Sequence, residues 1–243
     1  FFVVVAILLG LPAQAYEQTL EIPETPDLRV VLGPDTALTT TGYVEGQLVL
    51  RVQLVSRFPF EALALKTPSI PDAEVIELLR PRTRKVSSYA GEGYIFETSI
   101  AIIPRRSGIL TVPPVTAVGV IEPEPGRDVE FDLASEPVDV KVSGISPHYN
   151  DRDPDAWWLV AHRVEIDEDW SIPVEQIRVG EFVQRRIRLR VWGSTAERLP
   201  ELEHPRTRGI RVSLAAMETA TEKSPDGLIA TADYVWNLEA DPQ

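Results

Sequence analysis

The chain has 243 residues, enough for one or two domains, and 44% of them are hydrophobic, which is sufficient for a core. Its formal net charge of −13 argues against nucleic-acid binding, which needs a basic footprint, and against an anionic membrane surface. The chain contains no cysteine, which excludes disulfides, cysteine–zinc sites, iron–sulfur clusters and a thiol nucleophile.

The first 15 residues are expected to be the remnant of a secretory signal peptide. Residues 1–11 form an apolar run that is shorter than the ~18–20 residues a membrane span needs. Pro12 and the small-x-small triplet Ala13-Gln14-Ala15 follow, as at a signal cleavage site. A buried strand or helix is the alternative. On the signal interpretation the mature chain starts near Tyr16 and is exported, and the absence of cysteine fits a bacterial periplasm.

The mature chain alternates apolar and polar residues, which predicts an all-β fold. The alternation is clearest over 48–54 and recurs over 94–102, and period two of this kind is typical of half-buried strands. Further short strands are predicted at 28–32, 109–112, 115–120 and 138–142. Short helices are predicted only at 73–79 and 215–222. Short strands separated by Pro- and Gly-containing turns are typical of β-sandwiches.

The two halves of the chain resemble each other, which predicts two copies of one β unit. At an offset of 135 residues Val52 matches Ile187, and the same positions face the core in both strands. Further on, Phe96 matches Tyr234 at an offset of 138. Chance similarity between alternating strands is the alternative. The expected organisation is a first domain over 16–143, an acidic linker over 144–162 and a second domain over 163–243.

The linker carries three alternating carboxylates, Asp151, Asp153 and Asp155. Calcium prefers six to eight such oxygen ligands, so a calcium-clamped domain junction is one hypothesis. The EF-hand pattern is not met, because its sixth position is Ala156 instead of Gly and its twelfth is His162 instead of Glu. A solvated acidic linker is therefore the preferred interpretation.

The other polar residues predict no catalytic centre, no cofactor and no metal site. The histidines lack H-x-x-x-H or H-E-x-x-H spacing, and no G-x-S-x-G nucleophile motif occurs. A second acidic patch comprises Glu165, Asp167, Glu168 and Asp169. A hydrolase would need two carboxylates placed across a cleft, for example Asp153 or Glu168 with a partner, and no motif predicts such a pair. We expect that the protein is not an enzyme.

Five residues are candidates for binding a protein partner. Arg186, Arg188 and Arg190 fall on one face of a predicted strand, and arginine is favoured at interfaces. A solvated face paired with nearby carboxylates is the alternative. Trp157 and Trp158 follow the linker and are expected to anchor the domain junction or the start of the second domain.

The five tryptophans and six tyrosines also allow a periplasmic carbohydrate-binding module as an alternative function. Such a module needs an exposed, coplanar aromatic platform. The tryptophans are scattered over the second half, and Trp236 is in phase with Tyr234 and Leu238, which predicts a core position.

Several short motifs follow one another in a particular order between residues 28 and 242. They are Tyr43-Val44-Glu45-Gly46-Gln47, Pro104-Arg105-Arg106-Ser107-Gly108, Asp169-Trp170-Ser171, Arg178-Val179-Gly180-Glu181, and Asp226-Gly227-Leu228 running into Tyr234-Val235-Trp236. In order and spacing this series resembles the BatD family of bacterial oxygen-tolerance (aerotolerance) proteins.

The resemblance implies tandem immunoglobulin-like β-sandwich domains on the periplasmic side of the inner membrane, usually followed by a membrane-spanning helix. It implies a non-enzymatic scaffold linked to aerotolerance and stress resistance, acting with von Willebrand factor A-type membrane proteins and a MoxR-type ATPase. No catalytic residues carry over. The first copy continues from Pro104 to about residue 142, whereas Pro242 is followed by Gln243 alone. We therefore expect a fragment that lacks the membrane anchor and whose second domain is truncated, with an unpaired sheet edge.

Overall fold

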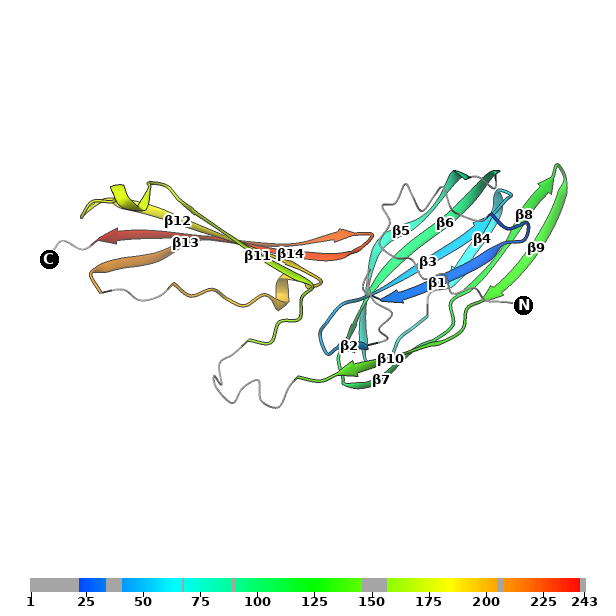
Figure 1. Ribbon diagram of the computed structural model, residues 1–243, viewed down its shortest axis with the longest axis horizontal. Helices are drawn as coiled ribbons and strands as arrows, with labels where there is room; N and C mark the ends of the chain where they lie inside the picture. The colour runs from blue at the N-terminus through cyan, green and yellow to red at the C-terminus, as the bar shows by residue number, and fades with distance from the viewer. Residues whose placement is uncertain are drawn as a thin grey trace. The chain divides into compact units, whose positions relative to one another are not determined.

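The computed structural model describes residues 22–33, 41–66, 68–88, 91–145, 157–204 and 208–240 (Figure 1). Within these ranges the regular structure consists of β-strands and two short 3-10 helices, so the all-β prediction is confirmed. Contacts divide the chain into two compact units, Phe1–Ser146 and Pro147–Gln243. None of the helical segments in the described ranges is long and apolar enough to cross a membrane.

A four-stranded antiparallel sheet with the order β1-β3-β6-β5 forms one layer of the first unit. Its strands are β1 (Asp27–Gly33), β3 (Leu48–Ser56), β5 (Ala73–Ser88) and β6 (Gly91–Pro104). Two three-stranded sheets accompany it, with the orders β2-β10-β7 and β4-β8-β9. Their strands are β2 (Thr41–Tyr43), β4 (Phe60–Lys66), β7 (Gly108–Val112), β8 (Thr116–Glu124), β9 (Arg127–Ala134) and β10 (Val138–Ser143).

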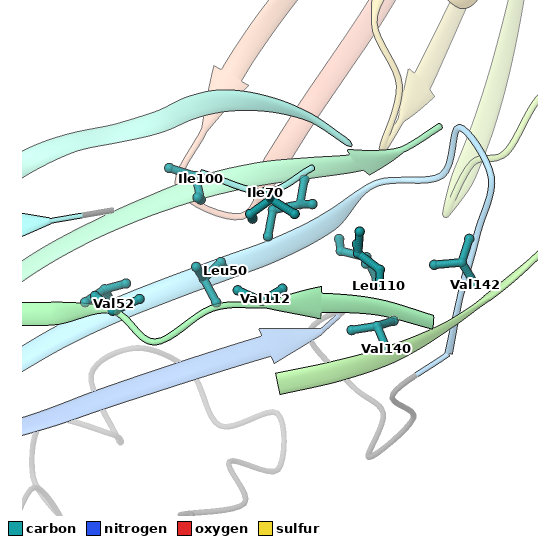
Figure 2. Packing of buried hydrophobic residues seen from close by; sticks show 11 residues of the cluster. Leu50, Val52, Ile70, Ile100, Leu110, Val112, Val140 and Val142 are labelled. Atoms are coloured by element: carbon teal, nitrogen blue, oxygen red, sulfur yellow. The ribbon is translucent and has the colours of Figure 1, made fainter. Parts of the chain in front are cut away.

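The core of the first unit lies between the four-stranded sheet and the sheet β2-β10-β7 (Figure 2). Alternate residues of β3 and β6 point inward, and Leu50 and Ile102 are completely buried. They pack in one cluster with the apolar side chains of β7 and β10, which are Leu110, Val112, Val140 and Val142. Each fully buried side chain of this kind contributes about 1.5–3 kcal/mol, so this two-layer packing is what holds the unit together.

The second unit contains one four-stranded antiparallel sheet, with the order β11-β12-β14-β13. Its elements are β11 (Arg163–Trp170), β12 (Phe182–Trp192), β13 (Ile210–Ser224) and β14 (Gly227–Ala240), with 3-10 helices η1 (Val174–Gln176) and η2 (Ala196–Arg198). One face packs against the connecting segments through Leu159, Leu199 and Leu202. In that core Tyr234 stacks on Trp236, with 5.3 Å between the ring centroids. The Tyr234 hydroxyl donates a hydrogen bond to the Pro200 carbonyl at 3.0 Å.

The two four-stranded sheets have the same strand order, but the predicted repeat alignment needs a correction. In the first unit Val52 pairs with Thr98, whereas in the second Ile187 pairs with Tyr234. If Val52 corresponds to Ile187, Tyr234 therefore corresponds to Thr98 and not to Phe96. The predicted offset of 138 is too large by two residues. Two residues are one full pleat, which is why the alignment still placed the correct side chains on the core face.

Both predicted helices are wrong, because residues 73–79 belong to β5 and residues 215–222 to β13. The register of β5 against β6 shifts between Glu77 and Leu79 and again between Leu79 and Arg82. That of β13 against β14 shifts between Leu214 and Ala216. A β-bulge adds a residue and breaks the alternation of period two. The resulting spacing of apolar residues imitates a helical pattern, although pairing with the neighbouring strand determines the structure.

Candidate interaction surface

The three predicted arginines lie together on one face of the second unit's sheet. Arg186, Arg188 and Arg190 are alternate, exposed residues of β12, and this face is opposite to the one that carries the core. The register of β11 places a carboxylate directly opposite each of them, namely Asp169, Asp167 and Glu165 respectively. The acidic patch seen in the sequence is thus the neighbour of the arginine row. Opposite charges at such cross-strand positions attract by roughly 0.2–1 kcal/mol per pair.

The arginines differ in the contacts that they make. The Nε atom of Arg188 lies 3.1 Å from both carboxylate oxygens of Asp233, on β14. Glu165 is bound by Arg163 of its own strand. Arg186 and Arg190 form no ion pair with any residue in the described ranges. Their guanidinium groups therefore retain hydrogen-bond donors that face solvent.

Trp192 lies at the end of this row, on the same face. The guanidinium carbon of Arg163 is 4.9 Å from the centre of the Trp192 ring, and that of Arg190 is 5.8 Å away. Both distances fall within the range of cation–π attraction. We call Arg163, Arg186, Arg190 and Trp192 the arginine–tryptophan face. Sequence reasoning missed Trp192 in this role, although its phase with Arg190 in one alternating strand was a usable signal.

On the core-facing side of the same sheet, Glu168 belongs to a closed polar network. Its carboxylate accepts hydrogen bonds from Arg185 Nε at 2.8 Å and from the Trp170 indole at 2.9 Å. The Arg185 guanidinium lies over the Trp170 ring, and its Nη1 is 3.2 Å from Nε2 of His204. Glu168, which the hydrolase hypothesis named, thus holds Arg185 in place beside the core.

Of the two tryptophans predicted to bind a partner, Trp157 is 54% exposed and Trp158 is half-buried. The Trp157 indole donates to the carbonyl of Arg198 at 3.0 Å, which ties it to η2 of the second unit. The three calcium candidates, Asp151, Asp153 and Asp155, lie outside the described residues, as do most of the predicted linker and the whole signal segment.

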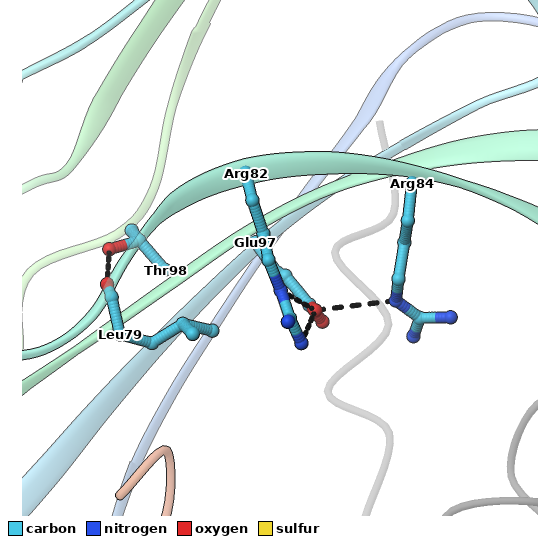
Figure 3. Close-up of polar contacts among 5 residues, drawn as sticks. All are labelled: Leu79, Arg82, Arg84, Glu97 and Thr98. Carbon is cyan, nitrogen blue, oxygen red and sulfur yellow. Dashed lines mark hydrogen bonds and ion pairs between the residues drawn. The ribbon is translucent and has the colours of Figure 1, made fainter. Parts of the chain in front are cut away.

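In the first unit, a largely buried carboxylate joins the two strands at the edge of the four-stranded sheet (Figure 3). Glu97 of β6, whose side chain is 12% exposed, accepts from Arg82 Nε at 2.8 Å and from Arg84 Nε at 3.3 Å. Beside it the Thr98 hydroxyl donates to the Leu79 carbonyl at 2.7 Å, at the bulge of β5. This cluster neutralises a buried charge and holds the irregular edge strand in register, which is a structural role.

A shallow depression on the sheet β4-β8-β9 is lined mainly by apolar residues. Its two charged lining residues are Glu130 and Asp132. The Phe131 ring lies against Gly119 there. A Cβ atom at position 119 would come within 2.7 Å of this ring and within 2.3 Å of the Ala62 carbonyl oxygen. The absence of a side chain at Gly119 is thus what lets the aromatic ring lie across the strand.

The described part of the chain contains no group of three or more His, Asp or Glu side chains placed to hold a metal ion. No family model matches the chain, and comparison with curated proteins and with solved structures gave no match either. The candidate surface is therefore described by its geometry alone: exposed arginines lie beside a tryptophan on one face of a four-stranded sheet.

Proposed function

We propose that the chain is a non-enzymatic, exported and membrane-associated interaction module of the BatD type. The resemblance of its motifs to that family supports the proposal, and the apolar segment over 1–11 supports export. The architecture is compatible with two immunoglobulin-like domains in tandem. In the first unit the four-stranded sheet and one of the two three-stranded sheets, β2-β10-β7, enclose a core, as the four- and three-stranded sheets of immunoglobulin constant-type domains do, and the second unit repeats the order of the four-stranded sheet.

The observation that carries the proposal is the arginine–tryptophan face. Tryptophan and arginine are enriched at protein interfaces and among the residues that dominate their affinity. Arg186 and Arg190 have no ion pair in the described ranges. On the neighbouring strand β11, Asp169 lies opposite Arg186, and Asp167 lies opposite the position between the two arginines. A complementary partner would therefore present carboxylates to the two arginines and a positive group to the neighbouring aspartates, which gives orientation as well as attraction.

The partner class follows from the family resemblance: von Willebrand factor A-type membrane proteins, acting with a MoxR-type ATPase in aerotolerance and stress resistance. The carbohydrate-binding alternative requires an exposed aromatic platform. In the second unit the parallel pair Tyr234 and Trp236 is buried, while Trp170 and Trp192 stack with arginines. We therefore propose protein binding in preference to sugar binding.

The test is co-purification of the full-length protein from bacterial membranes, followed by protein identification. We expect von Willebrand factor A-type proteins to be recovered. The double variant Arg186→Glu/Arg190→Glu should weaken capture at least tenfold, because the loss of one hot-spot arginine, about 2 kcal/mol or more, already exceeds the roughly 1.4 kcal/mol that a factor of ten requires. The matched control is the double reversal Arg80→Glu/Arg106→Glu, at side chains that are 94% and 76% exposed in the first unit. Recovery of no envelope protein by the full-length chain would contradict the proposal.

A further inference from the structure

Strand β13 lies at one edge of the second unit's sheet, and its outer side is open. β13 pairs with β14 on one side along its 15 residues, and no described strand pairs with its other side. Over residues 212–224 of β13, no backbone hydrogen bond to a described loop is found. The outward-facing N–H and C=O groups of an edge strand are a template on which another strand can pair.

The corresponding edge strand of the first unit, β5, is protected against such pairing. It has two register shifts, Pro81 within the strand, and a run of basic residues in Arg80, Arg82, Arg84 and Lys85. Bulges, proline and charge are the usual means of blocking an edge. β13 has a single register shift and no proline, and its residues 212–217 carry no charge. Of the two equivalent edges, only that of β13 has a composition that favours pairing.

The core-facing side of β13 is also incompletely covered. Leu214 and Met217 lie opposite Trp236 and Tyr234 of β14, which are buried. Leu214 nevertheless remains 54% exposed and Met217 45% exposed. A strand added next to β13 would place side chains beside both residues and remove part of this apolar surface from water.

We propose that β13 pairs antiparallel with β13 of a second copy of this chain, around a twofold axis at Met217. Ala215 is the extra residue at the bulge and is not counted in this register. Arg211 then lies opposite Glu222 of the other copy, and the twofold axis produces this pair twice. Leu214 then faces Thr219, and Met217 faces its own copy. The Arg211 side chain, which is 67% exposed and 3.3 Å from Glu239 of its own chain, would lie between two carboxylates.

Charge selects this register over its neighbours. A slip of two residues in one direction brings Glu218 opposite Glu218 of the other copy, and like charges at such positions are destabilising. A slip of two residues in the other direction removes both pairs of Arg211 with Glu222. A slip of one residue would exchange the two faces of the sheet. Since a single pair of strands is a small interface, we expect a dissociation constant between about 1 μM and 1 mM.

The first experiment is sedimentation equilibrium of the chain over that concentration range. The mass should rise from 27.1 kDa toward twice that value. Met217→Lys places two positive charges opposite each other and should weaken the dimer at least tenfold. Ile166→Lys is the matched control, because Ile166 is 64% exposed on the same face but on the other edge strand, β11. A monomer at every concentration, or a dimer that Met217→Lys leaves unchanged, would overturn the proposal.

The second experiment tests the register. The chain has no cysteine, so Met217→Cys introduces a single thiol that should oxidise to a disulfide-linked dimer, because opposed Cα atoms in antiparallel strands are about 4.5–5.5 Å apart. Ile166→Cys should not cross-link. Arg211→Glu and Glu222→Arg should each weaken dimerisation, and combining them should restore it at least in part. Absence of restoration, or equal cross-linking by both cysteine variants, would refute the register. Far-UV circular dichroism identifies any variant that fails to fold.

Discussion

Replacing Leu189 by Ala tests whether the second unit has a hydrophobic core of its own. Leu189 lies in the middle of β12, is 3% exposed, and belongs to a cluster with Ala230, Ala232 and Tyr234. The substitution removes three carbon groups at about 0.8 kcal/mol each, which gives about 2.4 kcal/mol for the transfer from water alone. The cavity left behind adds to this, so we expect a loss of about 2–5 kcal/mol in the free energy of unfolding.

The assay is urea unfolding followed by tryptophan fluorescence, because all five tryptophans lie in the second unit. With a urea dependence of about 1–3 kcal/mol per M, the midpoint should fall by roughly 0.7–5 M. Leu50→Ala is the control: it makes the same chemical change at a completely buried position of the first unit and should leave the fluorescence midpoint in place. A loss below about 0.5 kcal/mol for Leu189→Ala, or an equal fluorescence shift for Leu50→Ala, would refute the reasoning.

Three further predictions concern local structure. Glu97→Gln should lower the stability of the first unit by about 1–3 kcal/mol, measured by hydrogen exchange in β5 and β6, because the contacts with two arginines lose their charge. Gly119→Ala should cost about 1–3 kcal/mol through its clash with the Ala62 carbonyl, whereas Gly144→Ala, with contacts no closer than 3.4 Å, should be neutral in thermal unfolding. Hydrogen bonds from its own backbone N–H and from the Thr195 side chain lower the pKa of Glu197. Its contribution to stability is therefore present above its unfolded pKa and is lost as the pH falls, and Thr195→Ala should raise this pKa in an NMR titration.

The alternation of apolar and polar residues was sufficient to predict the all-β class and the central strands. The alternation in β12 follows directly from one buried and one more open face, whereas β3 is buried on both faces and alternates only around Arg51 and Gln53. The same reasoning failed at β5 and β13, where register shifts disturb the alternation. A bulge is stabilised by the neighbouring strand and leaves no distinct local pattern, so residues 73–79 and 215–222 were predicted as helices.

For the candidate surface, too, the sequence predicts one part and the tertiary structure decides the rest. The sequence alone placed Arg186, Arg188 and Arg190 on one face, because the period of a strand is two residues. Only the tertiary structure decided what lies beside them. The register between β11 and β12 brings the acidic patch opposite the arginines, and β14 supplies Asp233 to Arg188. Which strands become neighbours depends on burying the core of the second unit, a condition on the whole unit that no short segment encodes.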